Sequence, residues 1–231
     1  AGTVSNIGDV IQLLPGTHTV TALIRMQTAG VSLLGYPTSR TTGGMTTYGS
    51  SLCRPSSIVT STGTSTPLLS LEADNLEVGN LTLRPTPGFS AVIFRNQIAT
   101  APAGFRIHDC FFDMETPQPS QGTYGLDFAY RADNATAAGA SYSLKGAGPT
   151  TRVAYATGYV ERCTWVAKGA QGRGVDLATA NVTFRDCLFH VASGTWATPF
   201  AVATDARGCV LQSSIWTVAA NGLYNDCVDG T

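Results

Sequence analysis

Phe105-Arg-Ile-His-Asp-Cys-Phe-Phe112 and Val182-Thr-Phe-Arg-Asp-Cys-Leu-Phe189 are two copies of one pattern in this chain of 231 residues. Three further segments align with them without gaps: Leu76-Glu-Val-Gly-Asn-Leu-Thr-Leu83, Gly158-Tyr-Val-Glu-Arg-Cys-Thr-Trp165 and Cys209-Val-Leu-Gln-Ser-Ser-Ile-Trp216. The residues at the sixth position of successive segments lie 29, 53, 24 and 27 positions apart. Repeats of this length are typical of solenoid proteins, so they decide the fold.

Each repeat contains short runs in which apolar residues alternate with polar ones, a period that predicts β-strands. The third, sixth and eighth positions are predicted to face inward. A second short run accompanies each unit: Leu69-Ser-Leu71, Leu126-Asp-Phe128, Val175-Asp-Leu177 and Phe200-Ala-Val202. Units this small cannot bury an apolar face alone, but stacked coils share one continuous core. The spacing of 53 then predicts one coil with an insertion at about 131–157.

The opening residues Gly8-Asp-Val-Ile-Gln-Leu-Leu-Pro-Gly-Thr-His-Thr-Val20, followed by Ala29-Gly-Val-Ser-Leu-Leu-Gly35, resemble the first coil of one family. That family is the parallel β-helix group of pectate lyases, pectin esterases, polygalacturonases and bacteriophage tailspikes. The resemblance implies an all-β, single-stranded right-handed parallel β-helix in one domain over residues 1–231. Right-handed crossovers are the general preference for parallel strands. The fold itself carries many activities and also structural roles.

Composition excludes several classes of function. The net charge is −1, with 14 basic and 15 acidic side chains, so the chain lacks the basic field that nucleic-acid binding requires. No apolar run approaches the roughly 20 residues of a membrane-spanning helix. A hydrophobic content of 43% with little net charge argues against intrinsic disorder. We therefore expect no nucleic-acid or membrane partner.

Three of the six cysteines, Cys110, Cys163 and Cys187, fall at the sixth position and are predicted to form one internal line. They are interpreted either as a metal or redox site or as small buried hydrophobic residues, and the second interpretation is favoured. No Cys-x-x-Cys pair occurs, so the sequence predicts no metal site and no cofactor.

Two residues between the third and sixth positions must turn the chain, and many of them are charged. These pairs are Gly79-Asn80, His108-Asp109, Glu161-Arg162, Arg185-Asp186 and Gln212-Ser213. Opposite charges on neighbouring coils predict a solvated ladder of mildly favourable pairs, rather than a catalytic site.

The seventh position is predicted to face outward, where Phe111, Leu188 and Ile215 require cover. Either the insertion or a second chain provides it, and we favour a homo-oligomer, a trimer by analogy with phage fibres.

Asp127 and Asp176 are predicted at equivalent outward positions on adjacent coils, with Ala201 at the third equivalent position. Two neighbouring carboxylates are suited to Ca²⁺ binding or to glycoside hydrolysis, but solvated aspartates fit the pattern as well. The Asn-Thr-Asp and Gly-His-Gly strings of polygalacturonases do not occur. Asp127 and Asp176 are therefore catalytic candidates only if the chain is an enzyme.

These observations favour a structural protein of a bacteriophage particle: a tailspike, fibre or capsid-decorating β-helix that provides stability and attaches to surface glycan. A secreted polysaccharide lyase or glycoside hydrolase is the first alternative, and a bacterial surface adhesin is the second. Each places the chain in a virion, outside the cell or on its surface. The expected partners are other virion proteins and a surface polysaccharide. Because the ends of a solenoid need caps, we expect the chain to belong to a longer polypeptide or an assembly.

Overall fold

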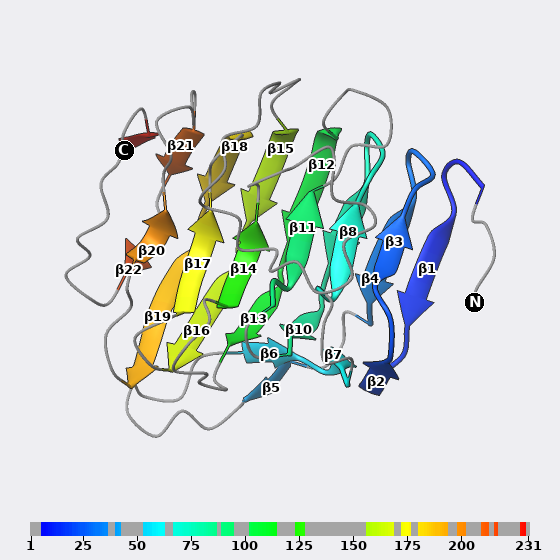
Figure 1. The fold of residues 1–231 in the computed structure, drawn as a ribbon, viewed down its shortest axis with the longest axis horizontal. Coiled ribbons are helices and arrows are strands. Elements are labelled where there is room, and N and C mark those ends of the chain that lie inside the picture. Colours follow the sequence, from blue (N-terminus) through cyan, green and yellow to red (C-terminus); the bar gives the residue numbers. More distant parts are fainter. Residues whose placement is uncertain are drawn as a thin grey trace.

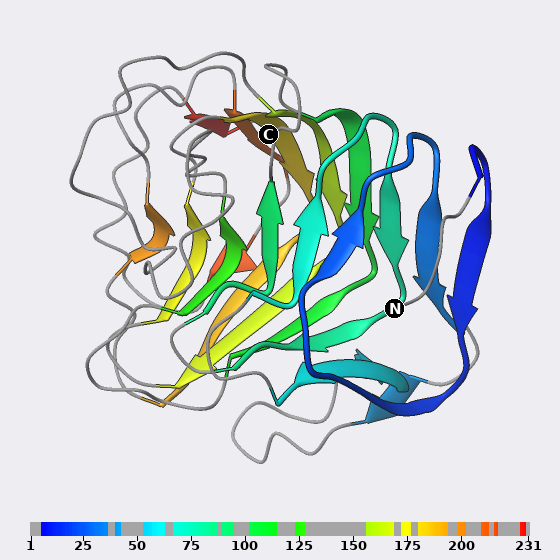
Figure 2. The same ribbon diagram turned by 45° about the vertical axis from the view of Figure 1, so that its right-hand side comes forward.

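The computed structural model is all-β, and its three large sheets are built of parallel strands. It describes residues 6–36, 40–42, 53–62, 67–86, 89–94, 102–114, 123–127, 156–168, 172–176, 180–193, 198–201, 209–212, 215–216 and 227–229. Successive strands visit the three sheets in turn, so the chain coils as in a parallel β-helix (Figures 1 and 2). Among the described residues, no helix is long and apolar enough to cross a membrane.

The first sheet, here called sheet A, has the order β1-β4-β9-β12-β15-β18-β21-β23. Its strands are β1 (Val10–Leu13), β4 (Ser32–Gly35), β9 (Glu77–Gly79), β12 (Ala103–His108), β15 (Ala156–Glu161), β18 (Ala180–Arg185), β21 (Cys209–Gln212) and β23 (Cys227–Asp229). They contain the first half of every predicted repeat segment. The candidate site described below lies on the outer face of this sheet.

Sheet B has the order β2-β7-β10-β13-β16-β19-β22, and sheet C has the order β20-β17-β14-β11-β8-β3. The strands of sheet B are β2 (Gly16–Val20), β7 (Ser57–Ser61), β10 (Thr82–Arg84), β13 (Phe111–Met114), β16 (Thr164–Lys168), β19 (Leu188–Ser193) and β22 (Ile215–Trp216). Those of sheet C are β3 (Ile24–Met26), β8 (Leu69–Leu71), β11 (Val92–Phe94), β14 (Thr123–Asp127), β17 (Gly172–Asp176) and β20 (Thr198–Ala201). A separate antiparallel hairpin joins β5 (Arg40–Thr42) to β6 (Cys53–Pro55).

The strand register confirms the gapless alignment of the repeat segments. In sheet A, Ile107 pairs with Val78 on one side and with Val160 on the other. In sheet B, Phe112 pairs with Leu83 and with Trp165. All six of these side chains are fully buried, so alternate residues of each strand form continuous internal rows. The sequence pattern did not reveal β11, which follows β9 and β10 in the coil of the Leu76–Leu83 segment.

The spacing of 53 residues also has a structural counterpart. β12 and β15 are direct neighbours, with Phe105 opposite Gly158, although a long segment separates them in sequence. The insertion expected at about 131–157 lies outside the described residues except for its last two, which belong to β15. The insertion therefore ends before Ala156, because this residue already pairs with Ala180.

Candidate functional site

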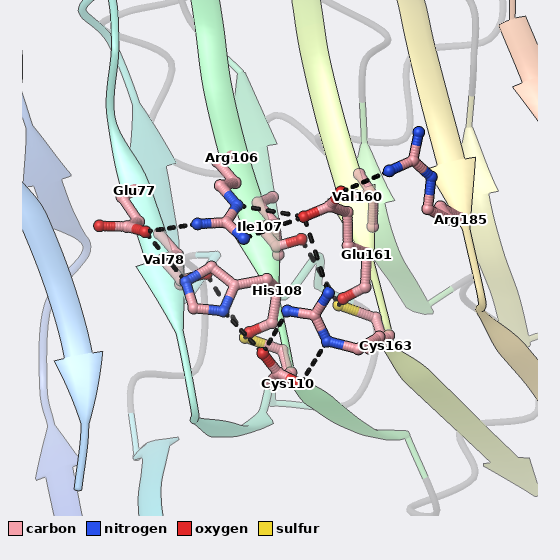
Figure 3. A network of polar contacts seen from close by, with 12 residues as sticks. Glu77, Val78, Arg106, Ile107, His108, Cys110, Val160, Glu161, Cys163 and Arg185 are labelled. Carbon is pink, nitrogen blue, oxygen red and sulfur yellow. Dashed lines mark hydrogen bonds and ion pairs between the residues drawn. The ribbon is translucent and has the colours of Figure 1, made fainter. Parts of the chain in front are cut away.

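A sharp corner follows sheet A in four successive coils. Its turning residues adopt left-handed backbone angles, with φ between 50° and 55° at Asn80, Asp109, Arg162 and Asp186. Asn and Asp adopt this conformation more readily than other non-glycine residues. The structure thus confirms four of the five predicted turning pairs, and Ser213 of the fifth lies outside the described residues. The repeated corner brings charged side chains from neighbouring coils side by side (Figure 3).

Arg106 joins three strands on the outer face of sheet A. Its Nε and Nη2 atoms donate hydrogen bonds of 3.1 Å to Glu161 Oε2, and its Nη1 donates one of 3.3 Å to Glu77 Oε1. Arg106 lies on β12, between Glu77 on β9 and Glu161 on β15. The predicted ladder contains only the turning pairs and not this link, because Glu77 and Arg106 stand at the second position of the repeat.

His108 lies within the same network, and it is buried rather than solvated as its place beside a turn suggested. Its Nε2 is 3.0 Å from Glu77 Oε1 and its Nδ1 is 2.8 Å from Asp109 Oδ2. The ring lies directly over Gly79, where an added Cβ atom would be only 2.4 Å from it. Gly79 therefore provides the room that lets His108 reach both carboxylates.

Asp109 and Arg162 form a bidentate pair between consecutive coils. Arg162 Nε donates to Asp109 Oδ1 at 2.9 Å, and Nη2 donates to Oδ2 at 2.8 Å. Burial alone would raise the pKa of Asp109, but the hydrogen bonds from Arg162 and His108 outweigh it, so this pKa is lowered. The bond to Asp109 in turn raises the pKa of Arg162. This contact confirms the predicted alternation of charge along the stack.

Glu161, at the centre of the network, forms ion pairs with two further arginines. Arg185 Nη1 lies 3.5 Å from Glu161 Oε1, as the predicted Glu–Arg pair requires, and Arg162 Nη1 lies 3.9 Å from Oε2. The side chain of Glu161 is only 12% exposed, so its charge depends on these partners. In chemical terms, the network consists of acids and bases that neutralise one another, and it connects four consecutive strands.

The cysteines at the sixth position stack as predicted, and they act as local hydrogen-bond donors. Cys110, Cys163 and Cys187 are free and buried. Each Sγ donates at 3.3 Å to the carbonyl two residues earlier, and more weakly to a carbonyl of the preceding coil. Burial raises the pKa of Cys163, and it raises that of Cys187 to about 12. Protonated thiols are poor nucleophiles and metal ligands, so these observations support the hydrophobic interpretation.

Within the part of the chain that the structure describes, no group of three or more His, Cys, Asp or Glu residues is arranged to hold a metal ion. The two catalytic candidates, Asp127 on β14 and Asp176 on β17, do pair in register, and Ala201 follows next to Asp176. Their strands are therefore adjacent, as predicted. The positions of their side chains lie outside the description.

Phe111 is covered by its own chain. It is 1% exposed, and the guanidinium of Arg54 lies 4.6 Å from its ring centroid. Arg54 belongs to β6, and its neighbour Pro55 accepts a 2.8 Å hydrogen bond from Thr82 Oγ1. Cover at this position thus comes from the hairpin before β7, so the prediction that the insertion or a second chain covers Phe111 is wrong. The side chains of Leu188 and Ile215 lie outside the description, although β10, β13, β16, β19 and β22 do place these residues in one row.

Two other buried carboxylates were not predicted as sites. Asp113 accepts hydrogen bonds from Arg84 at 2.7 Å and from Arg54 at 3.4 Å. Glu72 accepts two from Arg25, at 2.8 and 2.7 Å. No repeat position marked these residues, because Asp113 and Arg84 directly follow aligned segments and Glu72 and Arg25 lie between or before them.

No protein-family model and no curated protein matches the chain. Among solved structures, the chain is similar to the pectin methylesterase from Aspergillus niger in its deglycosylated form, with 14% identity and a TM-score of 0.48 over 97% of this chain and 76% of that one. It is also similar to ORF18 of Geobacillus virus E2, with 10% identity and a TM-score of 0.30 over 89% of this chain and 45% of that one.

Proposed function

We propose that the chain is a structural protein of a tailed bacteriophage: a tailspike, fibre or capsid-decorating β-helix that stabilises the particle and attaches it to surface glycan. In this proposal the chain is one right-handed solenoid with a single insertion, and it works in the virion or at a cell surface. The supporting observation is the network from Glu77 to Arg185. Its acids and bases bind one another between coils, which suits mechanical stability better than turnover.

The mechanical role follows from the geometry of the links. Every ion pair named in this network, apart from the contacts within His108-Asp109 and Glu161-Arg162, joins residues of different coils. A pulling force along the stack would therefore have to break several charge-assisted hydrogen bonds together with the strand ladders. The interior adds continuous apolar rows, in which Phe112 and Trp165 stack with ring centroids 4.7 Å apart.

The experiment begins with purified particles. We expect mass spectrometry to find the chain in a fixed number of copies per particle, and sedimentation of the isolated chain to show an oligomer, with a trimer expected. Leu188→Asp and Ile215→Asp should dissociate the oligomer while circular dichroism stays strand-like. Ile7→Asp, at an apolar residue that is 80% exposed before β1, is the control and should leave the oligomer intact. A monomeric wild-type chain that is absent from particles would contradict the proposal.

A second candidate function, polysaccharide cleavage, is favoured by one observation. Asp127 pairs with Asp176 on neighbouring strands of sheet C, which is the adjacency that a carboxylate pair would need. Incubation with polyuronate should then release oligosaccharides, and Asp127→Asn or Asp176→Asn should abolish the release. Equal rates in wild type and both variants would exclude these residues.

A further inference from the structure

The outer face of sheet A carries an exposed aromatic ring among the charged side chains. Tyr159 is 52% exposed and lies in the middle of β15. Its register partners are Arg106 on β12 and Thr183 on β18. Glu161 follows two residues later on the same strand and thus shares the outward face of the sheet. Tyr159 therefore stands beside the network of Figure 3 and on the same face of the sheet.

The charges of this face are layered. The side chains of Arg106, Arg162 and Arg185 are 47%, 45% and 46% exposed, whereas those of Glu161 and Asp109 are 12% and 14% exposed. The network is close to neutral as a whole, but its carboxylates, including Glu77 at 30%, are less exposed than the guanidinium groups. A ligand that approaches the sheet therefore meets guanidinium groups first.

The guanidinium groups are also held in position before any ligand arrives. Glu161 binds Arg106 at 3.1 Å and Arg185 at 3.5 Å. The guanidinium of Arg106 carries five N–H donors, of which two bind Glu161 and one binds Glu77, so it keeps donors for a ligand. Side chains that are already ordered lose less conformational entropy on binding. The face thus resembles a prepared anion-binding surface more than a set of mobile surface charges.

We propose that the outer face of β12, β15 and β18 binds an acidic polysaccharide, with Tyr159 stacking on a sugar ring and Arg106 and Arg185 binding its carboxylate groups. Guanidinium groups are suited to planar carboxylates, and an exposed phenol offers both an apolar ring and a polar tip. A nucleic acid would present phosphates instead of carboxylates, and the experiment distinguishes the two polymers. The inference rests on the glycan attachment proposed above, and it locates the glycan-binding site on the outer face of sheet A.

The test uses the 231-residue chain and two forms of one polymer: polygalacturonate, and the same polymer with its carboxyl groups fully methyl-esterified. Isothermal titration calorimetry at low salt should show binding of the acidic form, and at least about tenfold weaker binding of the esterified form. Tyr159→Ala should weaken binding of polygalacturonate about tenfold, as should Arg185→Gln. Tyr36→Ala removes another exposed phenol, which is 40% exposed, and should change the affinity less than about twofold.

Three results with the two polymers and the variants would overturn the inference. They are equal binding of the acidic and esterified polymers, no detectable binding of either, or equal losses in Tyr159→Ala and Tyr36→Ala. Tighter binding of a single-stranded oligonucleotide than of polygalacturonate would assign the face to a different ligand and would also overturn it. None of these results bears on whether the chain co-purifies with particles, so the structural role can stand or fall separately.

Discussion

Phe112 and Trp165 stack face to face in the core, with ring centroids 4.7 Å apart and an angle of 4° between their planes. They occupy the eighth position of consecutive repeats and pair across β13 and β16. Phe184 continues the aromatic cluster, with its centroid 6.5 Å from that of Trp165. Rings stacked at this spacing fill the interior between coils, so this position is where the core should be most sensitive to truncation.

Trp165→Ala should lower the free energy of unfolding by about 3–5 kcal/mol, because the cavity would lie at the centre of the aromatic stack. Urea denaturation followed by circular dichroism measures the loss. Tyr159→Ala, in the same coil but on the outer face, should cost less than about 0.5 kcal/mol. Similar losses in both variants would contradict the assignment of inner and outer positions.

Gly79→Ala should be destabilising by about 1–3 kcal/mol, because the new Cβ atom would lie 2.4 Å from the His108 ring and force it away from its carboxylate partners. The double variant with His108→Ala tests this cause, since removal of the ring also removes the clash. The cost of Gly79→Ala should largely disappear in the His108→Ala background. An unchanged cost would point to the backbone of Gly79 instead.

The lowered pKa of Asp109 predicts a dependence of stability on pH. A carboxyl group whose pKa is lower in the folded state stabilises the fold above its unfolded pKa of about 3.9, and this contribution is lost as the pH falls through the folded pKa. Asp109→Asn keeps a residue that tolerates left-handed angles. The difference in unfolding free energy between wild type and variant should be constant above about pH 5 and shrink below about pH 4. A difference that grows on acidification would refute the assignment.

The buried thiols should be unreactive in the folded protein. Cys53, Cys209 and Cys227 are first replaced by Ser, so that the only thiols that can be labelled are those of Cys110, Cys163 and Cys187. Because burial raises the pKa of Cys187 to about 12, a disulfide reagent at pH 8 should label it only as fast as the chain unfolds. Labelling rates that rise with urea in parallel with unfolding would agree. Rapid labelling without denaturant would show an accessible thiolate.

Arg54→Ala should expose the Phe111 ring and remove one cation from buried Asp113, at a cost of about 1–3 kcal/mol. Arg54→Lys keeps the charge but loses the planar group over the ring, so its cost should be intermediate. Thermal unfolding of the three proteins provides the comparison. Loss of stability in Arg54→Lys equal to that in Arg54→Ala would show that the planar contact with Phe111 outweighs the charge.

The repeat made the register of sheets A and B predictable, since a gapless alignment of inward residues leaves one way to stack the coils. Ile107 opposite Val160 and Arg162 opposite Asp109 follow from it directly. The link from Glu77 through Arg106 to Glu161 stands on the same strands, but it became visible only when outward side chains were followed across three coils.

The sequence by itself determined the coil: alternation assigns each side chain to the inside or the outside, and the repeat length assigns its neighbour in the next coil. Only the tertiary structure decided what covers the outside. The Arg54 guanidinium reaches Phe111 from a hairpin that belongs to no repeat, and Gly79 matters because His108 of the next coil rests on it. Such contacts depend on how far a side chain extends and on the path of irregular segments. Neither leaves a repeating pattern in the sequence from which the contact could be predicted.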